Sequence, residues 1–165
     1  MFKNIVIGAV VVLLILAVLL VLRFFALGKE SRQASAPGLL DGQLHPCPKS
    51  PNCVNSEYPV DTAHYVPAIE LAADVTTPIL TKANDVITAM GGVVVEQTES
   101  YLAAEFTSKL FGFVDDFELR FDEEKGVLQV RSASRVGYGD MGVNGKRVAA
   151  FREAFANAKA PSLEQ

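Results

Sequence analysis

An unbroken apolar run near the amino terminus, Ile5 to Leu22, constrains this chain more than any other feature. In an α-helix these 18 residues, with the five that follow them to Leu27 as an interfacial tail, span roughly 30 Å, about the thickness of a bilayer's hydrocarbon core. The run therefore predicts a transmembrane anchor over residues 1–27. The remaining residues have an ordinary soluble composition and leave room for one modest domain.

A cleavable signal peptide is the alternative interpretation of this run. Lys3 would supply its charged start, and Ala34-Ser35-Ala36 would supply a small-residue cleavage site. The apolar core of a signal peptide usually has about 7–15 residues, and charged or polar residues separate Leu27 from Ala34. We therefore favour a retained anchor and expect a single-pass membrane protein.

Charge is distributed unevenly along the chain. Residues 1–40 contain four basic residues and one acidic residue, whereas residues 41–165 contain eleven and eighteen. An acidic domain argues against a nucleic acid as partner. Arg23, Lys29 and Arg32 after the apolar run outnumber Lys3 before it, and by the positive-inside rule this excess would place the domain in the cytoplasm.

The two cysteines favour the other side of the membrane. Cys47 and Cys53 lie in a segment stiffened by prolines, and we predict that they form a disulfide, which requires an oxidising compartment. A zinc site that uses His45, Cys47, Cys53 and His64 is the alternative, but the cysteine spacing differs from that of common zinc fingers. We therefore expect no metal or other cofactor, and an extracytoplasmic domain.

Three further segments follow the anchor. Residues 28–44 are small and polar without apolar periodicity and indicate a linker. The folded domain is expected over residues 45–158, and residues 159–165, which contain Pro161, are expected to form a disordered tail.

The pattern of the domain predicts an α+β fold. Thr77 as cap, Pro78 in the first turn and apolar residues at helical spacing predict a helix over residues 78–90, and Asn144 is expected to begin a last helix. Strands are predicted over residues 66–71, 93–97, 101–107, 112–122 and the segment that ends at Ser134. The expected order is β-α-β-β-β-β-α, an antiparallel sheet of about five strands with two helices on one face.

The strands on either side of the turn at residues 123–126 can be aligned residue by residue. Side chains alternate between the faces of a strand, so one register satisfies the apolar and the charged pattern together, and a slip by one residue satisfies neither. The predicted pairs are Phe121–Leu128, Leu119–Val130, Phe117–Ser132 and Asp115–Ser134 on the core face and Glu118–Arg131 on the outer face.

Three motifs resemble the DUF1499 family, which is defined by a domain of unknown function. They are CPKSPNCVNS at residues 47–56, FVDDFE at 113–118 and RSASRVGYGDMGVN at 131–144. The resemblance covers about residues 45–155 and implies an exported or membrane-tethered protein with no established reaction. Gly145 stands where the pattern leads us to expect a further basic residue, and this argues against binding of a polyanion.

The same part of the chain contains a dense group of polar residues. In one interpretation they satisfy one another's hydrogen bonds and an arginine fixes the glycine-rich loop 137–142 to the sheet; in the other they line a pocket for an anionic ligand. Arg147 in the first turn of a helix opposes the helix dipole and needs an acidic partner, for which Asp140 is nearest in sequence. The candidate anion site is Arg131, Arg135, Asp140, Asn144 and Arg147, beside a buried polar cluster of Asp115, Ser132 and Ser134.

An enzymatic interpretation finds little support in these residues. Asp115 and Asp116 point to opposite faces of their strand, and His45 and His64 lie far along the chain from the serines. We name no catalytic residue and expect a non-enzymatic binding or interaction module in the cell envelope. The alternative is an envelope enzyme that acts on a small or lipid-derived substrate. Expected partners are the membrane and an envelope protein or a small hydrophobic or anionic ligand.

Overall fold

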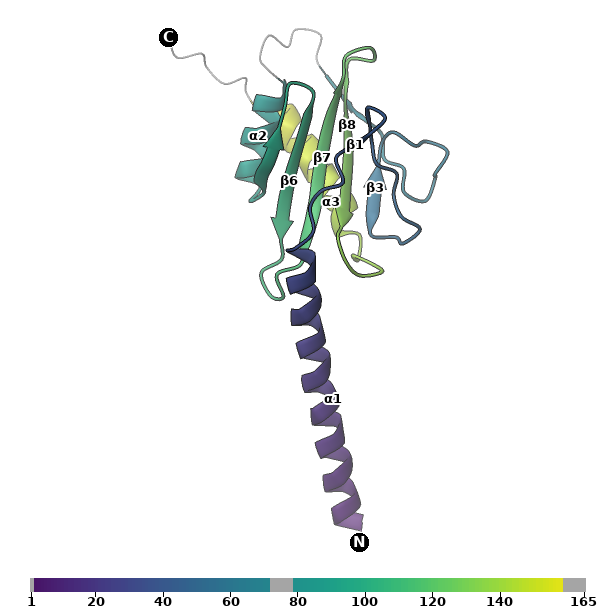
Figure 1. Ribbon diagram of the computed structural model, residues 1–165, viewed down its shortest axis with the longest axis vertical. Coiled ribbons are helices and arrows are strands. Elements are labelled where there is room, and N and C mark those ends of the chain that lie inside the picture. The colour runs from purple at the N-terminus through teal and green to yellow at the C-terminus, as the bar shows by residue number, and fades with distance from the viewer. Residues whose placement is uncertain (1, 72–78, 159–165) are drawn as a thin grey trace.

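The computed structural model describes residues 2–71 and 79–158, in which a long helix joins an α+β domain end-on (Figure 1). Helix α1 (Phe2–Ser31) exposes its apolar side chains and is long and apolar enough to span a membrane. The predicted cap Thr77, the neighbouring Pro78 and the predicted tail 159–165 lie outside the described residues.

An antiparallel sheet is the centre of the domain, as predicted. Among the described residues it has six strands in the order β3-β8-β7-β6-β5, with β4 also paired to β8. The extra strand is β3, which begins where the proline-stiffened segment ends and for which the sequence predicted no strand. The strands are β3 (Cys53–Asn55), β4 (Ile69–Glu70), β5 (Val93–Gln97), β6 (Tyr101–Thr107), β7 (Val114–Asp122) and β8 (Val127–Ser134).

The predicted register of β7 and β8 is confirmed in every pair. Phe117 lies opposite Ser132 on the core face, and Glu118 lies opposite Arg131 on the outer face. The alternation of apolar and charged side chains selects this register, because a one-residue slip would send the apolar set to the wrong face.

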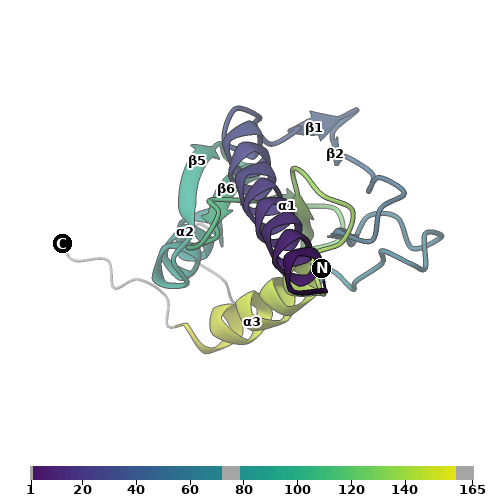
Figure 2. The same ribbon diagram turned by 90° about the horizontal axis from the view of Figure 1, so that it is seen from below.

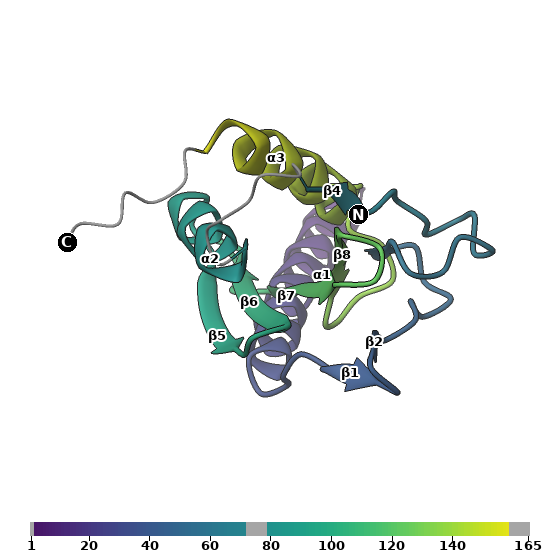
Figure 3. The same cartoon turned by 90° about the horizontal axis from the view of Figure 1, so that it is seen from above.

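Helices α2 (Ile79–Ala89) and α3 (Val143–Asn157) cover one face of the sheet, as Figure 3 shows. Phe117 of β7 and Phe151 of α3 are fully buried, and their ring centroids lie 5.0 Å apart. Burial of such rings provides most of the stabilisation on this face. α2 occupies nearly the span predicted for it, and α3 begins one residue before the predicted Asn144.

The opposite face is covered by the chain that leads out of α1. This segment contains the hairpin of β1 (Leu39–Leu40) and β2 (Gln43–Leu44), where the sequence indicated a linker. Leu44 is fully buried and packs against Tyr101 and Ala103 of β6. The apolar side chains of segment 28–44 show no regular spacing, because they reach the sheet from a hairpin of two very short strands and not from a long strand or helix.

α1 ends inside the domain and forms a stiff joint with it. Ser31 is fully buried; its Oγ accepts a hydrogen bond from the Val114 amide at 3.1 Å, and its carbonyl accepts one from Arg135 Nη1 at 3.1 Å. One turn earlier, Gly28 lies so close to the loop before β7 that a Cβ atom there would be 1.9 Å from the Phe111 carbonyl oxygen. This last turn of α1 therefore contacts both the first residue of β7 and the loop before it.

Candidate functional site

The sheet divides the polar residues that the sequence had grouped together. Because neighbouring residues of a strand face opposite ways, Arg131 and Arg135 belong to the outer face, whereas Ser132 and Ser134 belong to the core face. We name two clusters accordingly. The outer cluster is Tyr101, Glu105, Asp116, Glu118, Arg131 and Arg135, and the inner cluster is Asp115, Ser132, Ser134, Asp140, Asn144 and Arg147.

Arg135 is the centre of one half of the outer cluster. Its side chain is 3% exposed, and its Nη2 lies 2.7 Å from Asp116 Oδ1 and 2.6 Å from Glu105 Oε1. Its Nε donates to both Asp116 oxygens at 3.0 and 3.1 Å. Burial alone would lower the pKa of Arg135, but the hydrogen bonds with the two carboxylates outweigh it and raise that pKa above its ordinary value. This guanidinium is thus held by the protein's own carboxylates.

Glu118 is the centre of the other half. It is fully buried and accepts hydrogen bonds from Arg131 Nη1 at 2.6 Å, the Tyr101 hydroxyl at 2.7 Å and the Gly38 amide at 3.2 Å. Burial raises the pKa of the Glu118 carboxyl, and Arg131 and Tyr101 offset part of that rise. Burial and the neighbouring Glu118 also raise the pKa of Tyr101. The sequence predicted the pair of Glu118 and Arg131, but not that the segment after α1 would bury it.

Arg147 joins the strands to α3 in the inner cluster. Its Nη2 lies 2.8 Å from Asp115 Oδ2, and its Nη1 donates to Asn144 Oδ1 at 2.6 Å. Its guanidinium carbon also lies 4.7 Å from the centroid of the Phe106 ring. The acidic partner that a cation in the first helical turn requires is therefore Asp115, and not Asp140 as sequence distance had suggested.

Asp140 instead caps α3. Its Oδ1 accepts a hydrogen bond from the Gly142 amide at 2.9 Å, and its Oδ2 accepts one from the Asn144 amide at 2.8 Å. Burial alone would raise the pKa of Asp140, but these backbone donors outweigh it and lower that pKa. The free amides at this helix start, where the sequence suggested an anion, thus bind the protein's own carboxylate.

Asn144 connects the remaining members of the inner cluster. Its Oδ1 accepts a hydrogen bond from Ser132 Oγ at 2.6 Å, and its Nδ2 donates to Ser134 Oγ at 3.0 Å. Nδ2 also donates to the carbonyl of Asn52 at 3.1 Å, and the Asn52 side chain donates to the Gly137 carbonyl at 2.8 Å. Asn52, which the sequence analysis missed, therefore holds the glycine-rich loop that we had assigned to an arginine. Its position beside a disulfide cysteine is the signal that could have found it.

The predicted disulfide is present, with the sulfurs of Cys47 and Cys53 2.03 Å apart. His64, a member of the alternative zinc site, lies with Nδ1 2.7 Å from Asp61 Oδ2 and Nε2 3.2 Å from the Ser50 carbonyl oxygen. In the parts of the chain that the structure describes, no three His, Cys, Asp or Glu residues are grouped to hold a metal ion.

A groove of about 480 Å³ lies between β4, α2 and α3, on residues that sequence reasoning did not connect. Ile69, Leu71 and Phe155 give it apolar walls, and its charged lining residues are the cations Lys82 and Arg152 and the carboxylate Glu70. Lys82 Nζ lies 4.5 Å from the centroid of the Phe155 ring. The groove thus combines apolar surface with two cations and one carboxylate, an excess of one positive charge.

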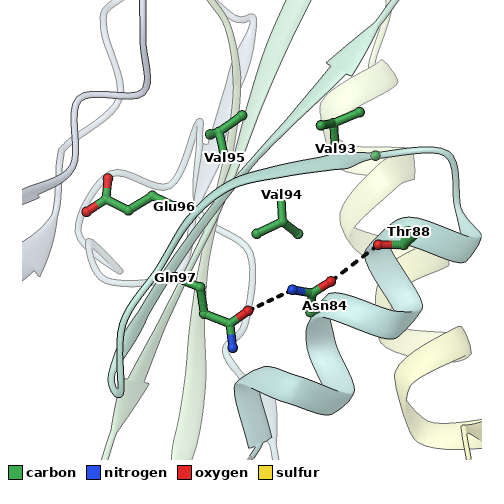
Figure 4. A pocket seen from close by; sticks show the side chains of 8 residues that line it. Asn84, Thr88, Val93, Val94, Val95, Glu96 and Gln97 are labelled. Atoms are coloured by element: carbon green, nitrogen blue, oxygen red, sulfur yellow. Dashed lines mark hydrogen bonds between the residues drawn. The ribbon is translucent and has the colours of Figure 1, made fainter.

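A second hollow, of about 460 Å³, lies between α2 and β5 (Figure 4). Its polar groups bind one another: Asn84 Nδ2 donates to Gln97 Oε1 at 2.7 Å, and Thr88 Oγ1 donates to Asn84 Oδ1 at 3.3 Å. Val93 and Val95 are exposed beside them. This hollow has no basic side chain in its lining, so the groove at β4 is the better candidate for binding an anionic ligand.

A family model described as "Protein of unknown function (DUF1499)" matches residues 43–155. No curated protein and no solved structure matches the chain. The matched span contains both clusters and the disulfide and does not include α1.

Proposed function

Since the chain belongs to the DUF1499 family, whose function is unknown, we propose a function from its own residues. The protein is a single-pass membrane protein whose extracytoplasmic domain binds a small amphiphilic anion without transforming it. The groove between β4, α2 and α3 is the observation that carries the binding role.

Membrane insertion is supported by the exposed surface of α1. An 18-residue window of this helix is wholly unburied and has a mean hydropathy of 3.6. Soluble proteins do not leave an apolar surface of this size in water, and a bilayer covers it fully.

The extracytoplasmic side is supported by the disulfide, because such bonds persist in oxidising compartments. The test is alkylation of whole cells with N-ethylmaleimide, which crosses membranes, followed by mass spectrometry of the protein. We expect Cys47 and Cys53 to react only after reduction. Reaction without a reductant would place the domain in the cytoplasm.

The groove fits an amphiphilic anion by its size and its chemistry. Ligand pockets commonly enclose about 300–1,000 Å³, and this groove has about 480 Å³. A short alkyl chain would lie against Ile69 and Phe155, while Lys82 or Arg152 would bind the anionic head group. Arg152 Nη2 already donates to the Pro67 carbonyl at 2.6 Å, which orients its guanidinium at the groove.

The binding test uses octanoate and the full chain in lipid nanodiscs. Octanoate should raise the melting temperature of the domain, whereas acetate, which lacks the chain, and octanol, which lacks the charge, should not. Lys82→Met should remove the response. Lys146→Met, which removes an exposed cation near the other end of α3, is the matched control and should keep it. An equal response in both variants, or none in the native chain, contradicts the proposal.

The alternative of an envelope enzyme has less support from the polar residues. Ser132 and Ser134 are hydrogen-bonded to Asn144, and Asp115 is paired with Arg147. A nucleophile or general base needs a lone pair directed at a substrate. These bonds therefore support a binding role over a chemical one.

A further inference from the structure

Two loops extend from the end of the domain at which α1 enters. β7 starts at Val114 and β8 ends at Ser134, and Asp115 pairs with Ser134, so loops 108–113 and 135–142 leave the same end of the sheet. Figure 1 shows both loops reaching past the last turns of α1, and Figure 2 looks along α1 onto this end of the domain. Any bilayer that holds α1 therefore faces these loops.

Aromatic contacts fix the level of loop 108–113 along the helix. The ring of Phe111 has its centroid 5.2 Å from those of both Phe24 and Phe25 in α1. These two helix residues follow directly after the apolar run and Arg23. A hydrocarbon core of about 20 helical residues, counted from the charged Lys3, ends near Leu22. The rings therefore lie at the level of the membrane interface, where aromatic side chains are enriched.

Large apolar side chains are exposed at the tips of both loops. Leu110 is 72% exposed, Tyr138 79% and Met141 95%. Both loops leave the end of the sheet at which α1 enters, so these side chains lie at that end of the domain. Apolar and aromatic side chains around a membrane helix are typical of segments that enter the lipid interface.

The charge at this end is opposite to that of the domain. Arg23, Lys29, Arg32 and Lys109 lie near the joint, against Glu30 and, in loop 135–142, Asp140, whereas residues 41–165 together are acidic. Basic residues next to a membrane helix favour anionic phospholipid headgroups. The surface therefore has the apolar tips and the charge that an anionic bilayer recognises.

We propose that the domain is seated on the bilayer in which α1 is anchored. Leu110 and Met141 enter the boundary between headgroups and acyl chains, Tyr138 lies among the headgroups, and Lys109 binds an anionic headgroup. This inference rests on the membrane insertion of α1 proposed above and adds a second, lipid-facing surface to it.

The chain contains no tryptophan, so one introduced tryptophan reports on its own position. The test uses the full chain in vesicles of phosphatidylcholine with about 30% phosphatidylglycerol, with and without brominated acyl chains that quench tryptophan. Leu110→Trp and Met141→Trp should each lose roughly half of their emission to the brominated lipid. Glu124→Trp, exposed in the turn at the opposite end of β7, is the control and should lose none.

Leu16→Trp in the middle of α1 separates failure of the seating from failure of the anchor. If Leu16→Trp is quenched while positions 110 and 141 behave like position 124, the seating is overturned and the anchor stands. If Leu16→Trp is not quenched, the anchor itself is overturned. The headgroup contact predicts stronger quenching of Leu110→Trp with phosphatidylglycerol than without it, and loss of that difference in a Lys109→Gln background. Equal quenching in both lipids overturns this contact.

Discussion

The face of the sheet under α2 and α3 is buried by aromatic and aliphatic side chains, whereas the opposite face is buried with its charges in place. On the first face Phe117 packs between Phe106 and Phe151. On the second, Glu118 and Arg131 are almost inaccessible and paired beneath the segment that follows α1. Apolar burial is not directional, while a buried charge needs its particular partner.

This difference gives the two faces different tolerance to change. The apolar face can be repacked by side chains of similar volume, because its stabilisation follows the area removed from water. The charged face depends on Arg135, on Glu118 and on backbone groups of Ser31 and Gly38. It therefore couples the domain to the helix that precedes it.

The largest expected effect belongs to the apolar face. Phe117→Ala should lower the free energy of unfolding by about 4 kcal/mol, because it leaves a cavity between two aromatic rings. Denaturant unfolding of the purified chain measures it. Leu110→Ala, at an exposed position, should change stability by less than about 0.5 kcal/mol in detergent. A loss below about 1 kcal/mol for Phe117→Ala would show that this face does not hold the domain together.

Loss of a paired arginine compares the two clusters directly. Arg135→Ala should cost about 3 kcal/mol, since it leaves Asp116 and Glu105 without their partner. Arg147→Ala should cost less, because Arg147 is 12% exposed against 3% for Arg135 and pairs with one carboxylate. Thermal and denaturant unfolding of both variants gives the order. Equal losses, or the reverse order, would contradict the view that stability depends more on the paired arginine of the outer cluster than on that of the inner cluster.

A smaller effect is expected where α1 meets the outer face. Ser31→Ala removes the acceptor for the Val114 amide and should lower stability by about 1 kcal/mol. Exposed Ser35 provides the matched control, and Ser35→Ala should have no measurable effect. Hydrogen exchange at the Val114 amide should also accelerate in Ser31→Ala. Unchanged exchange would mean that the joint does not depend on this hydroxyl.

A further effect appears only in acid. Burial would raise the pKa of Asp122 on the outer face, but hydrogen bonds from Lys125, Arg120 and Gln129 lower it from 3.8 to about 2. A carboxyl whose pKa is depressed by folding stabilises the protein above its unfolded pKa and loses that contribution as the pH falls through its folded pKa. The melting temperature should therefore fall more steeply between pH 4 and pH 2 in the native chain than in Asp122→Asn. Parallel curves of melting temperature against pH for the two proteins would show that Asp122 does not contribute to the loss of stability in acid.

The parts of the fold that follow a period could be predicted from the sequence. β7 and β8 alternate regularly, and one short turn joins them, so their pairs follow from counting. The segment after α1 that covers the outer face has no such regular spacing of apolar residues. Gly38 and Glu118, which it brings into contact, lie 80 residues apart, and only the folded sheet brings them together.

The sequence predicted which polar residues belong to the candidate site, but not that the sheet separates them into the outer and the inner cluster. The sequence identified Arg135, Asn144 and Arg147 as a dense polar group, and each of them makes several hydrogen bonds. It assigned Asp140 to Arg147 because the two are close in the chain. Asp115 reaches Arg147 instead, since antiparallel pairing brings the start of β7 to the end of β8, and α3 crosses there.

The close approach at Gly28 has a mechanical consequence. A helix of 30 residues is about 45 Å long. Where α1 meets Phe111 there is no room for a side chain, so the helix and the domain are in rigid contact. Membrane helices change their tilt when the bilayer becomes thinner or thicker. Any such tilt of α1 would act on the domain through this joint, because neither part can move there without displacing the other.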